Sequence, residues 1–405
     1  MLRFSTAGES HGESLVAFVS GLPAGVEVDQ AFVDRELWRR QQGYGRGGRM
    51  RIERDTAHIL SGVRHGKTIG SPVAMTLANN DWKNWTEILP VGPGDPSLHK
   101  AVASPRPGHA DLAGALKYDF KDARYVLERA SARESAARVA CGALAKLLLR
   151  ALGVEVGSHV IRVGKAELGR DAQWAEIVAA NAKEEIFLNC VDAEAEARMK
   201  AEVDAVLRTG DTVGGVFEVV VHGLAPGVGT HVNWDERMDG LLAQAVMSLQ
   251  AVKAVEIGRG VTAAESIGSA VHDAIGYEGR GTRDEGIAGG GSVAGGGFTK
   301  FSREKNNAGG LEGGISNGED VVVRGYLKPI STLRRPLGSV SFETREPVKA
   351  AYERSDVCVV PAAGVAAEAM VALTVAKLVL DKFGGDSLRE LERNYRGYCE
   401  QIREF

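Results

Sequence analysis

Cysteine is scarce in this chain of 405 residues. Four cysteines occur, and no two of them form a C-x-x-C pair: Cys141, Cys190, Cys358 and Cys399. This scarcity excludes a small secreted fold held together by disulfides, and it leaves no spacing typical of a zinc site. We therefore expect reduced thiols, no bound metal and a cytoplasmic location.

Long apolar runs are also missing. The most apolar stretch, residues 365–380, contains Glu368 and Lys377, so we expect no membrane span. The first residues include Arg3, Glu9 and Glu13 where a signal peptide would need an apolar core.

Charge of one sign is not in excess, because 49 basic residues stand against 53 acidic residues and give a formal net charge of −4. No overall field would attract nucleic acid or an acidic membrane. Apolar residues make up 44% of the chain, which is enough for the core of a globular protein. Glycine is abundant, with 51 residues, and indicates many turns or backbone that closely approaches a ligand.

Two stretches about 200 residues apart resemble each other. Residues 14–43 and 216–246 each contain a valine-rich strand, a turn of glycine, leucine, proline and alanine, and then a helix opened by aspartate. We interpret them as an internal duplication of a strand–turn–helix unit. The alternative is that a common turn chemistry occurs twice by coincidence.

Apolar spacing predicts long helices over residues 131–152 and 362–383, each ending at glycine, and a polar helix over 192–208. Strands are predicted at 216–222 and 320–327. This alternation favours a layered α/β or α+β architecture. In the glycine-rich stretch 276–318, we expect the first half to be a flexible loop and the second half to be an ordered turn at a site.

An arginine block lies between residues 35 and 54, with glycines interspersed. Adjacent residues on a helix point in different directions, so Arg39 and Arg40 cannot both face the core. Arginine forks bind phosphate and carboxylate in a bidentate manner, and glycine lets the backbone fold close to the anion. The alternatives are a solvated charged face or a nucleic-acid patch, although only Trp38 and Tyr44 could supply stacking. The block comprises Arg35, Arg39, Arg40, Arg46, Arg49, Arg51 and Arg54.

Two histidines, His11 and His109, follow or precede glycine in G-E-S-H-G-E and R-P-G-H-A-D. Histidine is the usual proton carrier near neutral pH, and a Pro-Gly turn places His109 on a rigid loop. Either could instead be a structural or surface histidine. Neither has the spacing of metal ligands.

Three further segments combine basic and hydroxyl residues at element ends. Ser131 and Glu134 match an S-x-x-E capping box, and Arg129 and Arg133 beside them would favour an anion at the helix start. The alternative is an ordinary helix cap. Residues 328–332 (Lys-Pro-Ile-Ser-Thr) follow a predicted strand, and residues 354–356 read Arg-Ser-Asp; either could be a plain turn.

Eight segments taken together resemble the chorismate synthase family. In order, they read GESHGES, RRQQGYGRGGRM, SGVRHGKTIGSPVA, RPGHADL, RASARESAARVA, GGISNG, LKPIST and ERSDVCVVPAAGVAAEAM. The resemblance runs from about residue 5 to residue 380. Each motif alone is modest, but eight in sequence are highly specific.

The resemblance implies a carbon–oxygen lyase of the shikimate pathway, which leads to the aromatic amino acids. The reaction is the anti-1,4-elimination of phosphate from 5-enolpyruvylshikimate 3-phosphate to give chorismate, and it requires reduced FMN without net redox change. NADPH is a possible reductant, and a separate flavin reductase is a possible partner. We expect neither nucleic acid nor membrane as a partner.

The fold implied is α+β, a β-α-β sandwich with an internal pseudo-twofold repeat that assembles as a homotetramer. We expect one domain over 1–405, with halves of about 1–210 and 211–385 and a flexible glycine-rich loop at about 276–303.

The resemblance also implies roles for individual residues. His11 would protonate the departing phosphate, His109 would lie near flavin N1, and Asp356 would serve the proton-removal relay through flavin N5. The arginines implied in binding the substrate or NADP are Arg40, Arg46, Arg49, Arg106 and Arg133. The FMN-contacting residues implied are Arg129, Ala130, Ser131, Gln250, Ala251, Gly313, Lys328, Pro329, Ile330, Ser331, Thr332 and Arg354.

One departure from the family pattern is Ser355, where some members have histidine. Two other classes of function stay open from the residues alone. One is a binding protein for polyanionic small molecules that has lost catalysis, and the other is a nucleic-acid binder built on the arginine block.

Overall fold

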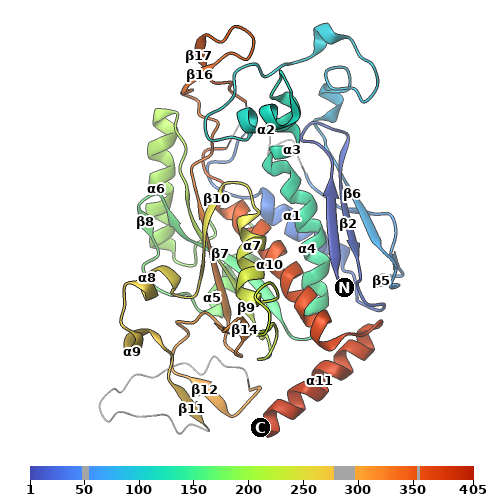
Figure 1. The fold of residues 1–405 in the computed structure, drawn as a ribbon, viewed down its shortest axis with the longest axis vertical. Helices are drawn as coiled ribbons and strands as arrows, with labels where there is room; N and C mark the ends of the chain where they lie inside the picture. The colour runs from blue at the N-terminus through green and yellow to red at the C-terminus, as the bar shows by residue number, and fades with distance from the viewer. Residues whose placement is uncertain (48–53, 278–296, 354–355) are drawn as a thin grey trace.

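The computed structural model describes residues 1–47, 54–277, 297–353 and 356–405. The fold consists of two antiparallel sheets with a layer of helices between them (Figure 1). This arrangement is the expected α+β, β-α-β sandwich.

The first sheet has the strand order β1-β2-β6-β3. Its middle strand β2 alternates, with Leu15, Ala17 and Val19 buried and Val16 and Phe18 exposed, so one face packs on the helices. The strands are β1 (Arg3–Ala7), β2 (Ser14–Ser20), β6 (Val73–Ala78) and β3 (His58–Ile59).

The second sheet has the strand order β10-β15-β9-β7-β8. The valine-rich strand β15 pairs along its full length with residues 215–221 of β9, and the two strands lie inside this sheet. The strands are β10 (Val252–Ile257), β15 (Val321–Leu327), β9 (Gly215–His222), β7 (Glu155–Val163) and β8 (Ala166–Glu167).

The helix layer is built around α10 (Val360–Phe383), which packs against α4 (Ser135–Arg150), α7 (Met238–Met247), β7 and β9. Helix α1 (Gln30–Gln41) contacts both α4 and α10. Among the described residues, α10 is the helix with the length and hydropathy to cross a membrane, but 83% of its most apolar window is buried inside the fold. It is therefore the core helix of the sandwich.

The remaining elements lie outside these three layers. The other helices are α2 (Asp111–Tyr118), α3 (Arg124–Ala130), α5 (Trp174–Ala182), α6 (Ala193–Thr209), α8 (Gly260–Ala264), α9 (Gly268–Val271), α11 (Leu388–Glu404) and the short 3₁₀ turns η2 (Trp82–Asn84), η3 (Pro96–Leu98) and η4 (Ala132–Glu134). Two-stranded pairs are β4 (Val63–Arg64) with β5 (Lys67–Thr68), β11 (Ile275–Tyr277) with β12 (Phe301–Arg303), β13 (Leu311–Glu312) with β14 (Ile315–Ser316), and β16 (Gly338–Val340) with β17 (Pro347–Lys349).

The two similar stretches of sequence each form a strand, a turn and a helix. The first gives β2 and α1, which starts after the N-cap Asp29, and the second gives β9 and α7. Helix α7 differs from the expectation because its N-cap is Arg237, while Asp239 lies in the first turn. The division of the domain into halves near residue 210 stays a prediction.

The predicted glycine-rich loop at about 276–303 does not extend to both of its predicted ends. Its ends are strands, because β11 and β12 pair through Tyr277 and Phe301. Residues 278–296 lie outside the described residues, so the prediction of flexibility stays open for them. The second half of the stretch forms the ordered hairpin β13–β14, and its place at a site stays a prediction.

Candidate active site

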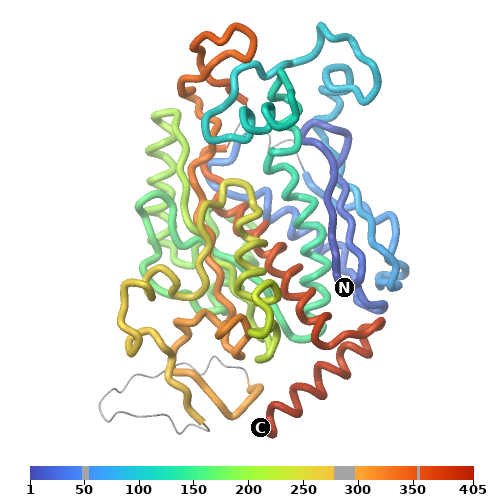
Figure 2. Tube along the Cα trace, in the orientation of Figure 1, coloured from blue at the N-terminus to red at the C-terminus, as the bar shows by residue number. Residues whose placement is uncertain are grey.

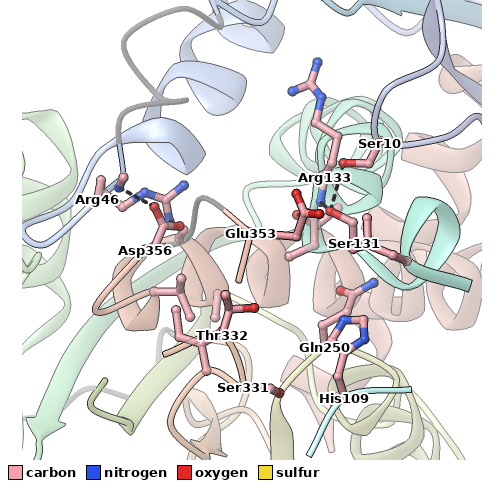
Figure 3. A pocket seen from close by; sticks show the side chains of 18 of the residues that line it. Ser10, Arg46, His109, Ser131, Arg133, Gln250, Ser331, Thr332, Glu353 and Asp356 are labelled. Atoms are coloured by element: carbon pink, nitrogen blue, oxygen red, sulfur yellow. Dashed lines mark hydrogen bonds and ion pairs between the residues drawn. The ribbon is translucent and has the colours of Figure 1, made fainter. Parts of the chain in front are cut away.

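A cavity of about 250 Å³ opens at one end of the helix layer. Its walls combine the loop before β2, the end of α1, the turn η4, the turn after α7, the segment after β15 and the start of α10. Figure 2 shows that these segments come from distant parts of the chain, and Figure 3 shows their side chains around one space. The predicted site residues that line it are His11, Arg40, Arg46, Arg106, His109, Ser131, Arg133, Gln250, Ile330, Ser331, Thr332 and Asp356.

His11 is buried and held from two sides. Its Nδ1 lies 2.8 Å from Oε1 of Glu128 on α3, and its ring lies against that of Trp85 in a tilted contact, with centroids 3.9 Å apart. The loop that carries it turns at Gly8, whose φ is +102°, and a Cβ there would lie 2.5 Å from the carbonyl oxygen of Ser14. Glycine is thus required for the loop to bring His11 onto the cavity.

His109 lies on the loop before α2 and is tied to Asp111, with Nδ1 and Oδ1 2.5 Å apart. The same aspartate accepts hydrogen bonds from the backbone N–H and the Nε–H of Arg106, at 3.0 Å and 2.8 Å. Burial alone would raise the pKa of Asp111, but its hydrogen bonds with His109 and Arg106 outweigh burial and hold that pKa well below its usual range. The motif is therefore a rigid unit built on one buried carboxylate.

Arg40 and Arg133 share a second buried carboxylate, Asp55. Arg133 donates to both oxygens of Asp55, at 2.6 Å and 2.7 Å, and Arg40 donates to Oδ2 at 2.9 Å. Burial lowers the pKa of Arg40, and Arg133 lowers it further, while Asp55 partly opposes them. One acid thus holds two cations at the cavity wall.

Asp356 lies opposite, near the start of α10. It accepts a hydrogen bond from the backbone N–H of Gly47 at 2.5 Å, and its Oδ2 lies 3.3 Å from Nη1 of Arg46 (Figure 3). The carboxylate is partly exposed, so it combines a fixed direction with access to the cavity.

The segment after β15 supplies hydroxyls and an ammonium group beside the His109 loop. The Ser331 hydroxyl and Lys328 Nζ both donate to the carbonyl oxygen of Gly108, at 2.9 Å and 2.6 Å, and Arg106 donates to the Thr332 hydroxyl at 2.9 Å. Burial and the neighbouring Lys253 hold the pKa of Lys328 below its usual value.

Comparisons with known proteins give the family of the chain independently of this geometry. Residues 2–380 match the family model described as chorismate synthase. The chain is 75% identical to a chorismate synthase of Acidobacterium capsulatum and 68% identical to one of Koribacter versatilis, with 100% of each chain covered in both alignments.

The chain belongs to the chorismate synthase family. A solved chorismate synthase structure has the same fold, with a TM-score of 0.75 at 38% identity, and the alignment covers 100% of this chain and 99% of that one. As chorismate synthases are, the chain is a carbon–oxygen lyase of aromatic biosynthesis.

Some residues that the chorismate synthase resemblance implied for FMN do not line this cavity. Arg129 is half exposed and donates to the carbonyl oxygens of Thr6 and Gly8, and Gly313 lies in the β13–β14 turn beside His231. Ala130, Ala251 and Pro329 are each adjacent in sequence to a lining residue, and Nζ of Lys328 lies 3.1 Å from the hydroxyl of Ser331, which lines the cavity. Their roles stay predictions. Arg49 and Arg354 lie outside the described residues.

Two expectations from the sequence were wrong. Arg39 and Arg40 are both buried, because Arg39 points to Glu368 in the helix layer while Arg40 points to Asp55 at the cavity. Ser131 caps the turn η4 instead of forming a capping box, and the carboxylate of Glu134 bonds to Thr6 and Arg138. Helix α4 therefore begins at Ser135, later than predicted.

Sequence reasoning missed the buried acids that hold the site together. Glu128 directly precedes the motif that begins at Arg129, and Asp55 directly follows the arginine block, but both make their contacts across the fold. Trp85 lines the cavity from a segment without a motif, whereas Glu353 begins the quoted E-R-S-D motif and was given no role. Among the buried acids described above, only Asp111 could have been suspected from the sequence, because it lies two residues after His109.

Three members of the arginine block do not belong to an open basic surface. Arg39 and Arg40 are buried against acids, and Arg46 faces Asp356, whereas Arg54 is exposed. Among the described residues, no group of three or more histidine, cysteine or acidic side chains is arranged to hold a metal ion.

Proposed function

We propose that this chain converts 5-enolpyruvylshikimate 3-phosphate to chorismate by anti-1,4-elimination, in the presence of reduced FMN. The observation that supports the proposal most is the convergence of two histidines, four arginines and Asp356 on one cavity. These groups suit a phosphate leaving group, carboxylates and a proton that must be removed.

The lining arginines suit an anionic ligand, although neighbouring acids already offset part of their charge. Four arginines line the cavity with Asp81, Glu353 and Asp356, and Asp55 and Asp111 hold three of these arginines from outside the lining. Nε of Arg40 is buried without a hydrogen-bond partner among the described residues. A buried anion costs several kcal/mol unless it is paired, as an order of magnitude, so fixed guanidinium groups favour binding.

The residues present also fit FMN. Ser131 begins the turn η4, and Ser331 and Thr332 add hydroxyls, which suit a phosphate and a sugar chain. Leu249 and three alanines of α10 give an apolar wall for a flat ring: Ala362, Ala363 and Ala366. When bound, reduced FMN supplies the electron density that assists loss of phosphate.

The protein's own groups then carry the protons. His11, which lines the cavity with Arg40 and Arg133, donates a proton to the departing phosphate, and Asp356 accepts the proton lost from the substrate. His109, fixed by Asp111, keeps a proton at the cofactor end of the cavity. Substrate and cofactor that fill the cavity displace water from it, which strengthens these interactions.

The test is release of phosphate by purified protein without oxygen, with chemically reduced FMN and 5-enolpyruvylshikimate 3-phosphate. We expect phosphate and chorismate to form together, and only when the flavin is reduced. No release under these conditions would contradict the proposed function.

We further propose that reduced flavin comes from a separate supply, that the chain works as a cytoplasmic homotetramer, and that NADPH is at most an indirect reductant. Adding NADPH and oxidised FMN to the protein alone tests the first point. Flavin bleaching under those conditions would show an intrinsic reductase instead. Light scattering of the purified protein tests the tetramer.

A further inference from the structure

Glu128 on α3 directs both of its carboxylate oxygens at a single residue, His11. Oε2 accepts the backbone N–H of His11 at 2.8 Å, and Oε1 lies 2.8 Å from its Nδ1. The backbone carbonyl of Glu128 also accepts the N–H of Ser10 at 2.9 Å. Glu128 is buried, and so is His11, so water competes little for these contacts.

This contact decides which nitrogen of His11 can exchange a proton with the cavity. A carboxylate only accepts hydrogen bonds, so Nδ1 must carry hydrogen when it faces Oε1. Nε2, on the opposite side of the ring, has no hydrogen-bond partner within the part of the chain that the structure describes. The close, tilted contact with the Trp85 ring opposes rotation of the imidazole.

We propose that Glu128 is a positioning residue that fixes the Nδ1–H tautomer of His11 and presents Nε2 to the departing phosphate. This inference rests on the proposed function. When Nε2 gives up its proton, the ring returns to the neutral Nδ1–H form without turning, because Glu128 still holds Nδ1.

His109 has the same arrangement, with Asp111 behind Nδ1. Asp111, however, also binds Arg106 through three of its N–H groups, so substitution there would disturb an anion-binding side chain as well. Glu128 is the cleaner test because its nearest arginine, Arg124, is 3.8 Å away and does not line the cavity.

A purely structural role for Glu128 is the competing explanation, since it also ties the loop before β2 to α3. The variant Glu128→Gln distinguishes a structural role from the positioning role. In a carboxamide of the same size, an NH2 group that only donates replaces one of the two oxygens, so the variant cannot accept at both positions that Oε1 and Oε2 occupy. A structural role predicts lower stability with an unchanged tautomer and kcat.

The first experiment is ¹⁵N NMR of histidine-labelled protein without ligands, with His11→Ala to assign the signal. We expect neutral His11 in the native sequence to be the Nδ1–H tautomer, and Glu128→Gln to mix in the Nε2–H form. His159 is an internal reference of opposite sense, because its Nε2 lies 2.9 Å from Glu218. An Nε2–H tautomer for His11 in the native sequence overturns the proposal, even if the variant does not fold.

The second experiment is steady-state phosphate release. We expect Glu128→Gln to lower kcat by about 10²-fold, the lower end of what a general acid contributes, with little change in KM. Asp320→Asn is the matched control, because it breaks an aspartate contact to Nδ1 of His222 far from the cavity and should leave kcat unchanged. Native kcat in Glu128→Gln overturns the proposal. If the native protein releases no phosphate, the proposed function fails, while the NMR result still decides the tautomer.

Discussion

Buried acids hold the cations and histidines of the cavity in fixed directions. Asp55 holds Arg40 and Arg133, Asp111 holds His109, and each acid is itself nearly inaccessible to water. Removing such an acid leaves a buried charge without its partner, whereas an exposed pair contributes little. The acids should therefore matter as much as the residues that would touch the substrate.

His109→Ala tests the proton-holding role of that side chain. We expect kcat for phosphate release to fall by about 10² to 10⁴-fold, the usual contribution of an acid–base group, with the fold intact. The control is His58→Ala, on the exposed side of β3, which should keep native kcat. An unchanged kcat in His109→Ala would show that the role is wrong.

Asp55→Asn tests the shared carboxylate. We expect a loss of about 3–5 kcal/mol in the free energy of unfolding, because two buried guanidinium groups lose their charge partner. Substrate affinity should weaken as well, since Arg40 and Arg133 are no longer held. Chemical unfolding and ligand titration measure both effects. Asp119→Asn, in an exposed pair with Lys121, is the control and should change neither.

Helices α1, α4 and α10 are joined by an ionic cluster inside their apolar layer. Glu36 and Arg39 come from α1, Lys146 from α4 and Glu368 from α10, and all four are buried. Lys146 contacts both acids, and Arg39 binds Glu368 at 2.7 Å and 2.8 Å. Because Arg40 follows Arg39, this cluster also sets where the cavity arginine lies.

The cluster predicts how stability depends on pH. Burial would raise the pKa of Glu36, but Arg39 and Lys146 outweigh burial and lower that pKa from 4.5 to about 2. A lowered pKa stabilises the folded state above pH 4.5, and this stabilisation is lost as pH falls through about 2. Unfolding curves measured from pH 6 to pH 2 should show that loss. In Glu36→Gln, the free energy of unfolding should fall less steeply with decreasing pH. An equally steep fall would mean that other acids cause the loss of stability.

The contact between α4 and α10 depends on Gly142. A Cβ at this position would lie 2.2 Å from Cβ and 2.4 Å from Cα of Ala369, so the helices would have to move apart. We expect Gly142→Ala to lower the free energy of unfolding by about 1–3 kcal/mol. Gly397→Ala on α11 meets nothing within 4 Å and should instead stabilise by about 0.5–1 kcal/mol. Thermal unfolding of the two variants distinguishes packing from helix propensity. If helix propensity alone decided the outcome, both variants would be more stable than the native protein.

Local patterns predicted the long elements well. Helix α10 is marked by its own apolar spacing and by the glycine that follows it, and strand β2 by its alternation of buried and exposed residues. Both signals are local and therefore visible in the sequence. The predicted start of α4 was wrong because Glu134 accepts a hydrogen bond from Thr6 on β1. The two residues are 128 positions apart in sequence, so local spacing does not reveal their contact.

At the scale of the whole molecule, the cavity exists only because distant segments meet at one end of the helix layer (Figure 2). The motifs identified His11, Arg106, His109 and Asp356, since each stands in a string of glycine, proline or charge. The acids behind them, such as Glu128, stand in ordinary helical surroundings. Their role follows from the packing of α3 against the loop before β2, which no local pattern encodes.

The central claim is that one cavity of this chain holds both the substrate and the cofactor. A crystal structure with 5-enolpyruvylshikimate 3-phosphate and FMN tests it most directly. We predict that both molecules lie in this cavity, with the substrate phosphate near His11 and the arginines and the flavin ring along the start of α10. Either molecule bound elsewhere, with the cavity left empty, would contradict the account.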